Sequence, residues 1–451
     1  ARRDLTCEWP GSRYDVGHPD GDRPILACFL CDLELHDRHM SGLAASEEVQ
    51  VDPQQRLLLR DATSLSNVKR SKGSSMGVTI GIAGTEYAAL AGKVSQPVNA
   101  FTATSSALSV ASGRIAYTHG LQGPTFSVDT ACSASLVAFH SARLALTSTH
   151  AATMMVSGVN TILGVQIMVV FQTAGMLGEE GRCKTLDESA DGYGRGEACV
   201  SMQLGELLDI GESHAAAALS CAGSAINQDG RSSALTAPHG PSQRAVVLSA
   251  LREASGCMEM VNAVQAHGTG TPLGDPIEIG ALCSLMEETG APLTVAAAKS
   301  LVGHTETAAG ALGLVESISQ LVRQAVVEVG HLRCRNPFVA TLTEGRERLL
   351  RATRAGQEYE AGGGQLAGTS SFGFSGTNAH ALLEMVGVPM GRGDCGRSVE
   401  HTARAWVRAA GHPLQAGCEL SLDGGSGGSM LLISHNSVSR MTSLAVCDHR
   451  V

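Results

Sequence analysis

Short apolar runs alternate with helical segments from Val51 to about Glu384, and glycine-rich loops separate them. The predicted strands are 77–82, 125–130, 258–266 and 293–299, and the clearest predicted helices are 133–146 and 306–327. This alternation indicates an α/β architecture with buried sheets. Aromatic residues make up only 3% of the chain while glycine occurs 53 times, so we expect small side chains in the core and closely packed backbones, as in layered folds.

The bulk composition excludes several classes of protein. A net charge of −10 argues against a nucleic-acid-binding protein, which needs clustered positive charge. The 13 cysteines have no framework spacing, which indicates free thiols in a reducing compartment. Cys28 and Cys31 form a CxxC pair, but no second pair at zinc spacing accompanies them, so we expect no metal site.

The chain is expected to be a soluble cytoplasmic protein, with a plastid location left open. Residues 1–20 are polar and charged, unlike a signal peptide. The stretch 151–178 has no charged residue, but glycine, asparagine and glutamine interrupt it repeatedly. It therefore predicts two short buried elements and no membrane span.

Cys132 lies where a predicted strand turns directly into a helix, in the segment DTACSAS. The helix that follows is apolar nearly all round, which indicates that it is buried. Its N-terminus directs free N–H groups and a positive dipole end toward the sulfur, which favours the nucleophilic thiolate. The alternative, on position alone, is one more small buried thiol.

Two histidines follow predicted strands on glycine-containing loops. His267 opens the segment HGTGTPLGDP, whose glycines allow close approach of a ligand, and whose Thr269 and Thr271 supply hydroxyls for an extended substrate arm. His304 lies between Lys299 and Glu306, a charge pair that can fix its tautomer. Either histidine alone is more often structural. The glycines and threonines that closely follow His267 favour a functional role for this histidine.

A third loop, SSFGFSGTNAH, begins at Ser370. It is either an ordinary glycine-rich turn or the source of a backbone N–H donor for an oxyanion, with an aromatic ring as a gate.

Together these segments resemble the β-ketoacyl synthase family, and specifically the ketosynthase domains of type I polyketide synthases. The matching segments are DTACSAS around Cys132, HGTGTPLGDPIE from His267, KSLVGH from Lys299, SFGFSGTNAH from Ser371, DPQQRLLL from Asp52, SGRIAY from Ser112, GRCKTLDESADGYGRGE from Gly181 and NQDGRSSALTAPHGPSQ from Asn227. They occur in the family's order and cover roughly residues 30–385.

The resemblance implies the thiolase-like fold, in which two similar α/β halves stack as a five-layered αβαβα sandwich, usually in a homodimer. The implied organisation is a divergent N-terminal segment 1–30, an N-terminal half 31–255 with the nucleophilic cysteine, a C-terminal half 256–386 with both histidines, and a divergent linker or tail 387–451.

The resemblance also implies a mechanism, decarboxylative Claisen condensation in polyketide or fatty acid chain elongation. Cys132 would take an acyl group from the phosphopantetheine of an acyl carrier protein, and a malonyl-type extender on a second carrier would lose carbon dioxide and attack the acyl-cysteine. His267 and His304 would donate hydrogen bonds to the extender's thioester oxygen. No metal or freely bound cofactor is implied. The expected partners are the acyl carrier protein, a second copy of the chain and other polyketide synthase domains.

The resemblance assigns further roles residue by residue. Lys299 would be catalytic by ordering the histidine loop. Phe374 would gate the site and, with Cys132, supply the backbone N–H groups that bind the oxyanion. The implied substrate-binding residues are Thr269, Thr271, Glu306 and Asn378.

The chain departs from its family near the N-terminus. No strand of the type IAIIGMxCRFPG precedes Arg13, the stretch 35–44 lacks the family's aromatic residues, and the helix expected between Leu59 and Gly77 is shortened. These departures concern sheet completion and dimer packing and touch no catalytic position. Three alternatives stay open: a chain-length or priming partner, a catalytically impaired module for carrier binding or dimerisation, and a cysteine hydrolase.

Overall fold

A computed structural model of the chain describes most of the region from Leu5 to Val386 and one later strand. The described residues are 5–10, 25–31, 33, 41–65, 72–84, 86–93, 98–149, 151–206, 218–290, 292–323, 325–326, 329–344, 350–352, 359–360, 366–386 and 405–409.

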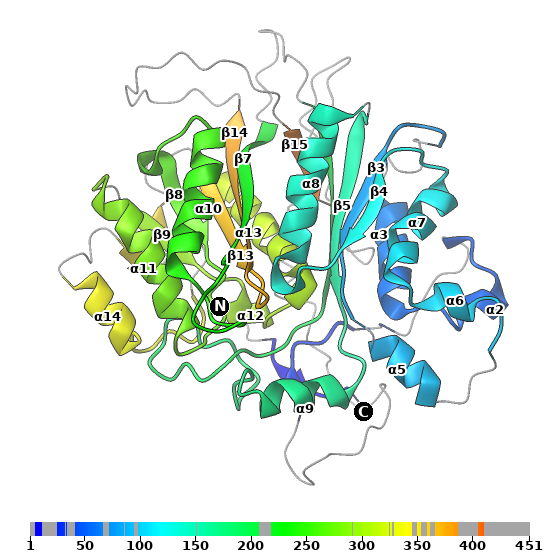
Figure 1. Cartoon of the computed structure of the whole chain (residues 1–451), viewed down its shortest axis with the longest axis horizontal. Helices are drawn as coiled ribbons and strands as arrows, with labels where there is room; N and C mark the ends of the chain where they lie inside the picture. The colour runs from blue at the N-terminus through cyan, green and yellow to red at the C-terminus, as the bar shows by residue number, and fades with distance from the viewer. Residues whose placement is uncertain are drawn as a thin grey trace.

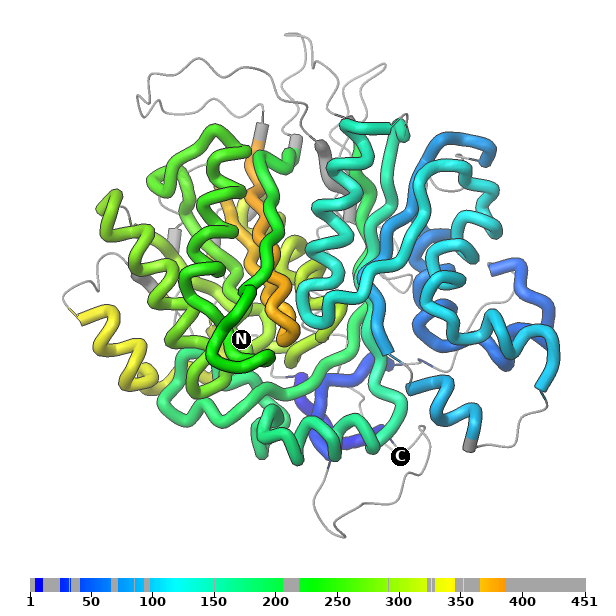
Figure 2. The backbone as a smooth tube through the Cα atoms, in the orientation of Figure 1, coloured from blue at the N-terminus to red at the C-terminus, as the bar shows by residue number. Residues whose placement is uncertain are grey.

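The main sheet contains two similar halves, which confirms the predicted thiolase-like organisation (Figures 1 and 2). Its eleven strands run in the order β11-β9-β8-β13-β14-β7-β15-β6-β5-β3-β4, in which β15 is Ala405–Ala409. The strands of the first half are β3 (Gly77–Gly81), β4 (Thr125–Val128), β5 (Thr153–Asn160) and β6 (Ala198–Glu206). Those of the second half are β7 (Ala218–Gln228), β8 (Val261–Gln265), β9 (Leu293–Ala296), β11 (Leu350–Ala352), β13 (Leu366–Phe372) and β14 (Thr377–Val386).

The two halves repeat one arrangement of strands. In the first, β4, β3 and β5 are parallel and β6 is antiparallel to β5. In the second, β9, β8 and β13 are parallel and β14 is antiparallel to β13. Except for the edge strand β4, the parallel strands are almost fully buried, because helices cover the sheet.

Helices form three layers, and hydrophobic clusters fill the spaces between the layers. The helices that matter here are α3 (Pro53–Ser64), α7 (Leu108–His119), α8 (Ala134–Ser148), α10 (Gly240–Glu253), α11 (Gly274–Glu287) and α13 (Ala309–Arg323). One cluster joins α3 and α7 to the first half, a second joins α10 and α11 to the second half, and the third surrounds α8 and α13 between the halves. The two halves of the sheet are the other two layers, one on each side of α8 and α13. The predicted five-layered αβαβα sandwich is therefore confirmed.

The predicted elements near the site occur with small shifts. The uncharged stretch 151–178 forms β5, which is buried as predicted, and the short helix α9 (Val165–Thr173), which is not: only its Val165 and Met168 are buried. None of the helices in the described part of the chain is long and apolar enough to cross a membrane. The helix predicted from residue 306 begins as the 3₁₀ turn η3 (Glu306–Ala308) and continues as α13.

One strand lies in a region where the sequence indicated only a linker or tail. β15 (Ala405–Ala409) inserts between β6 and β7 and is antiparallel to both. In the second half the corresponding place, beside β14, is occupied by β7. β15 therefore takes the position that the family's opening strand was expected to fill. The N-terminal pieces β1 (Cys7–Glu8) and β2 (Leu26–Ala27) pair only with each other among the described strands.

Candidate active site

Cys132 sits in the predicted turn between β4 and α8. A single 3₁₀ turn, η1 (Ala131–Ser133), connects them, and Ala131 has the left-handed φ of +53° that a sharp turn before a nucleophile requires. Backbone N–H groups of Cys132 and Phe374 lie near enough to the sulfur to lower the pKa of its thiol. Both donors of the predicted oxyanion site therefore lie beside the sulfur.

Close packing of backbones fixes the start of α8. Ser135 is fully buried and three glycines surround it. A Cβ at Gly81 would lie 2.3 Å from the Ser135 nitrogen, and one at Gly158 would lie 2.7 Å from the Ser135 Cβ. Its hydroxyl accepts a hydrogen bond of 2.9 Å from the backbone N–H of Ala311 at the start of α13. Glycine is required at these positions because a side chain would push α8 away from the sheet.

His304 lies against the sulfur. Its Nε2 is 2.9 Å from Sγ of Cys132, and the side chain is 1% exposed. The backbone N–H of Glu306 donates to Nδ1 at 3.2 Å, so Nδ1 is an acceptor and the neutral ring carries its proton on Nε2. His304 therefore presents an N–H donor to the site.

His267 joins the same cluster. Its ring centroid is 5.5 Å from that of His304, and the two rings are perpendicular. The backbone N–H of Phe372 donates to Nδ1 at 3.2 Å, which again places the proton on Nε2. The loop is held from behind, because the Glu278 carboxylate accepts N–H bonds from His267 and Gly268 at 2.8 and 2.9 Å.

Burial controls the protonation of the cluster. It lowers the pKa of His267 and of His304 well below the usual value, and the Lys299 ammonium lowers both pKa values further, so both rings are neutral. Burial, followed by the negative charge of Glu306, raises the pKa of the Cys132 thiol to about 12. The expectation that the helix terminus makes the thiolate the favoured form is therefore wrong for the resting site: desolvation outweighs the backbone dipoles.

The other predicted residues lie at different depths. Lys299 is buried at the start of α12 (Lys299–Val302), where burial lowers its pKa and the Glu278 carboxylate opposes that change. Thr269 and Thr271 lie on the loop after His267, with their hydroxyl oxygens 3.4 Å apart. The buried amide of Asn378 donates to the side chains of Asn227 and Asp229 at 3.0 and 2.7 Å, so it is held by protein partners.

A cavity of about 400 Å³ opens beside the sulfur. Its lining includes Cys132, Phe374, Asn160, Phe171 and Tyr193. Phe374 is 46% exposed, which suits the predicted movable gate. The sulfur is therefore accessible from a cavity, as the predicted mechanism requires.

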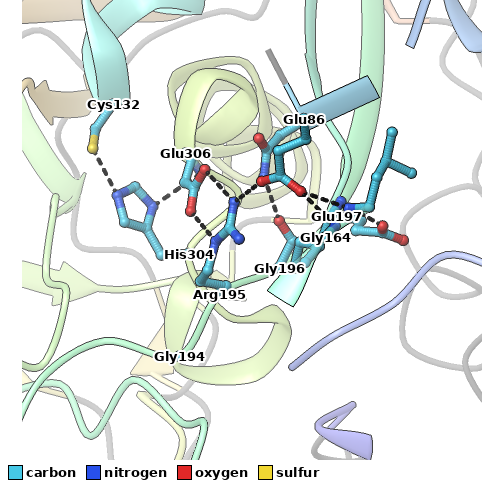
Figure 3. A network of polar contacts seen from close by, with 12 residues as sticks. Glu86, Cys132, Gly164, Gly194, Arg195, Gly196, Glu197, His304 and Glu306 are labelled. Atoms are coloured by element: carbon cyan, nitrogen blue, oxygen red, sulfur yellow. Dashed lines mark hydrogen bonds and ion pairs between the residues drawn. The ribbon is translucent and has the colours of Figure 1, made fainter. Parts of the chain in front are cut away.

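Glu306 belongs to a polar network that the sequence interpretation missed (Figure 3). Its carboxylate forms an ion pair with the buried Arg195, and Arg195 also pairs with Glu86. Arg195 lies in the matched segment GRCKTLDESADGYGRGE, and that segment was the available signal, but nothing in it indicated a partner 111 residues away.

Two other contributors were also missed. The hydroxyl of Ser371 donates to the carbonyl oxygen of Cys132 at 2.6 Å, and Glu278 holds the His267 loop. Each lies inside a recognised segment, but its role depends on contacts between distant residues. Among the described residues, no group of three or more metal-ligating side chains is present.

Comparisons with known proteins agree with this geometry. Family models match over residues 6–209, for the N-terminal domain of β-ketoacyl synthases, and 219–333, for the C-terminal domain. Polyketide synthase GfsB of Streptomyces halstedii is 38% identical over 85% of the chain, which spans 7% of that protein. Erythronolide synthase EryA2 of Saccharopolyspora erythraea is 35% identical over 84% of the chain, which spans 11% of it.

Solved structures give the same result. The ketosynthase from module 6 of the bacillaene synthase of Bacillus subtilis 168 superimposes with a TM-score of 0.72 at 30% identity, covering 85% of this chain and 67% of that one. The oxazolomycin ketosynthase domain OzmH KS7 of Streptomyces albus JA3453 gives 0.75 at 26% identity, covering 86% and 71%.

Proposed function

The chain belongs to the β-ketoacyl synthase family, as a ketosynthase domain of the modular polyketide synthase type, and from this premise we propose that it catalyses decarboxylative condensation in chain elongation. The observation that carries the proposal is the convergence of Cys132, His267 and His304, with Nε2 of His304 2.9 Å from the sulfur beside an open cavity.

The first step is transfer of an acyl group to Cys132. Its sulfur attacks the thioester carbonyl of an acyl carrier, a new carbon–sulfur bond forms, and the carrier's carbon–sulfur bond breaks. The thiol proton leaves with the carrier's thiol. Backbone N–H groups of Cys132 and Phe374 stabilise the oxyanion of the tetrahedral intermediate.

The second step is loss of carbon dioxide from a malonyl-type extender. Nε2–H groups of His267 and His304 donate to the extender's thioester oxygen as it becomes an enolate. Each donor contributes about 3 kcal/mol in a site closed to water. The enolate carbon then attacks the acyl-cysteine carbonyl. The new carbon–carbon bond forms, the bond to Cys132 breaks, and the released thiolate takes a proton from water.

Partners follow from the same proposal. We propose that Thr269 and Thr271, whose hydroxyls face each other on the loop after His267, hold the phosphopantetheine arm of an acyl carrier domain, and that the reaction needs no resident cofactor. Glu306 and Asn378 are engaged by protein partners, so we assign them to maintaining the site. A homodimer is proposed at β4, an edge strand whose Phe126 is 37% exposed.

Three observations support condensation over the alternatives. A chain-length or priming partner that has lost condensation typically lacks one of the reactive side chains, and here all three are present. An impaired module would need a sealed or scattered site, whereas the sulfur lies beside a cavity. A hydrolase needs a base to activate water, and both histidines are instead held as N–H donors.

The Cys132→Ala variant tests the proposal. With radiolabelled acyl carrier, we expect label on the wild type and none on the variant, because the nucleophile is missing. With malonyl carrier, the variant should still release carbon dioxide, because both histidine donors remain. Circular dichroism checks that both proteins are folded. A folded wild type that neither takes up label nor releases carbon dioxide would favour the non-catalytic module.

A further inference from the structure

The contact that fixes the His304 tautomer comes from a strained residue. Glu306 supplies the N–H that Nδ1 accepts at 3.2 Å, and its φ is +44°. A left-handed backbone is unfavourable for any residue with a Cβ, by about 1–2 kcal/mol. Something in the structure must therefore hold Glu306 in this conformation.

Arg195 holds the Glu306 side chain by a two-point ion pair. Its Nε donates to Oε1 at 2.5 Å and its Nη2 donates to Oε2 at 3.0 Å. The Arg195 side chain is 1% exposed, so water does not compete for these bonds. Paired N–H donors matched to a carboxylate fix its orientation as well as its position.

Arg195 is itself fixed on its other side. Nη2 also donates to Glu86 at 3.0 Å, and the second oxygen of Glu86 accepts N–H bonds from Leu163 and Gly164 at 2.7 and 2.8 Å, at the start of α9. Figure 3 shows the resulting chain of contacts from Cys132 through His304, Glu306 and Arg195 to Glu86.

The backbone on either side of Arg195 also hydrogen-bonds the backbone of His304. The N–H of His304 donates to the carbonyl of Gly194 at 2.6 Å, and the N–H of Gly196 donates to the carbonyl of His304 at 2.8 Å. Arg195 thus reaches the histidine loop by its backbone neighbours and, through Glu306, by its side chain.

We propose that Arg195 is a positioning residue for His304, which keeps Glu306 in its left-handed conformation so that His304 retains its proton on Nε2. The inference rests on the proposed function, because that proton is the donor to the extender's thioester oxygen. Loss of the ion pair lets Glu306 relax, releases Nδ1 and allows the ring to exchange tautomers.

Nitrogen NMR of protein with ¹⁵N-labelled histidine reports the tautomer directly. The matched pair is Arg195→Gln and Arg143→Gln, since Arg143 is another buried arginine in an ion pair, with Glu253 at 2.6 Å, and its hydrogen bonds within the described residues go to Glu253 and Ser224, not to His267 or His304. His304→Asn identifies the His304 signals. We expect the Nδ1 signal of His304 to lose its acceptor character in R195Q and to stay unchanged in R143Q.

Kinetics give a second readout. Replacing a group that orients a functional histidine typically reduces activity by about 10–100-fold. We expect this loss in kcat for malonyl decarboxylation by R195Q, with acyl loading of Cys132 changed less than threefold. Guanidinium added to Arg195→Ala should restore part of the decarboxylation.

Two variants of Glu306 decide the backbone argument even if R195Q does not fold. Glycine adopts a positive φ without strain, whereas alanine keeps the strain and lacks the carboxylate. Glu306→Gly should therefore keep more of the His304 tautomer and more decarboxylation than Glu306→Ala. Equal behaviour of these two would overturn the proposal, as would an unchanged His304 spectrum in folded R195Q. If the wild type does not decarboxylate at all, the function fails while the tautomer measurement still tests Arg195.

Discussion

The contact between α8 and α13 predicts opposite effects of the same substitution at two helical glycines. A Cβ at Gly310 would lie 2.7 Å from the Leu136 Cβ and 2.9 Å from the Leu136 backbone nitrogen. A Cβ at Gly280, in α11, would find its nearest neighbour, a Leu342 methyl group, at 3.7 Å, which is an ordinary contact.

The magnitudes follow from these distances. Alanine in place of helical glycine gains about 1 kcal/mol of helix propensity. Overpacking in a core costs about 1–3 kcal/mol, and the upper end applies at Gly310 because a backbone atom cannot rotate away. Gly310→Ala should therefore lower the free energy of unfolding by about 2 kcal/mol, and Gly280→Ala should raise it by about 1 kcal/mol. The two variants should differ by about 3 kcal/mol.

Urea denaturation of the two variants measures this difference. Since α8 begins beside Cys132 and α13 follows His304, Gly310→Ala should also slow acyl loading, whereas Gly280→Ala should leave it unchanged. Equal urea midpoints for the two variants would refute the claim that close backbone packing positions the nucleophile.

Three further outcomes are expected. Burial raises the pKa of Asp61 from its usual 3.8 to about 6, so the wild type loses stability as pH rises through this window. In urea denaturation, the free energy of unfolding of Asp61→Asn should match that of the wild type at pH 4 and exceed it by about 3 kcal/mol at pH 8. A difference in unfolding free energy that does not change with pH would contradict this. His267→Asn should slow malonyl decarboxylation about 10²–10³-fold with acyl loading nearly unchanged, and similar losses in both assays would argue against separate roles. Deleting residues 387–451 removes β15 and should lower the urea midpoint; no change would mean that β15 adds nothing to the sheet.

Much of the site could be predicted because its residues occur in local patterns. A cysteine at a strand–helix turn and a histidine after a strand can each be recognised within one short segment. Their proximity comes from the fold, because Cys132 follows β4 and His267 follows β8, strands far apart in the sheet order, and the packing of the two halves brings these segments together. The pairing of Arg195 with Glu86 and Glu306 could not be predicted, because it joins three segments whose proximity depends on the whole fold.

The protonation state of Cys132 shows a different limit. The sequence indicates the helix terminus, which lowers a thiol pKa, but it does not give the desolvation that raises it. Here burial is the largest contribution, and the Glu306 carboxylate adds to it. The balance of these opposing effects depends on packing, so only the structure could give its sign.

β15 fills an open place in the sheet between the two halves. Without it, the end of β6 from Met202 to Glu206 would leave N–H and C=O groups without partners on that side. β15 pairs along β6 from Met202 to Glu206 and continues onto β7, so it closes the gap between the two halves. Sequence patterns favoured no such strand, because residues 387–451 show no sustained periodicity and the demand for a partner arises in strands far away in the chain. An open backbone edge in the folded sheet thus explains a strand that local propensity did not predict.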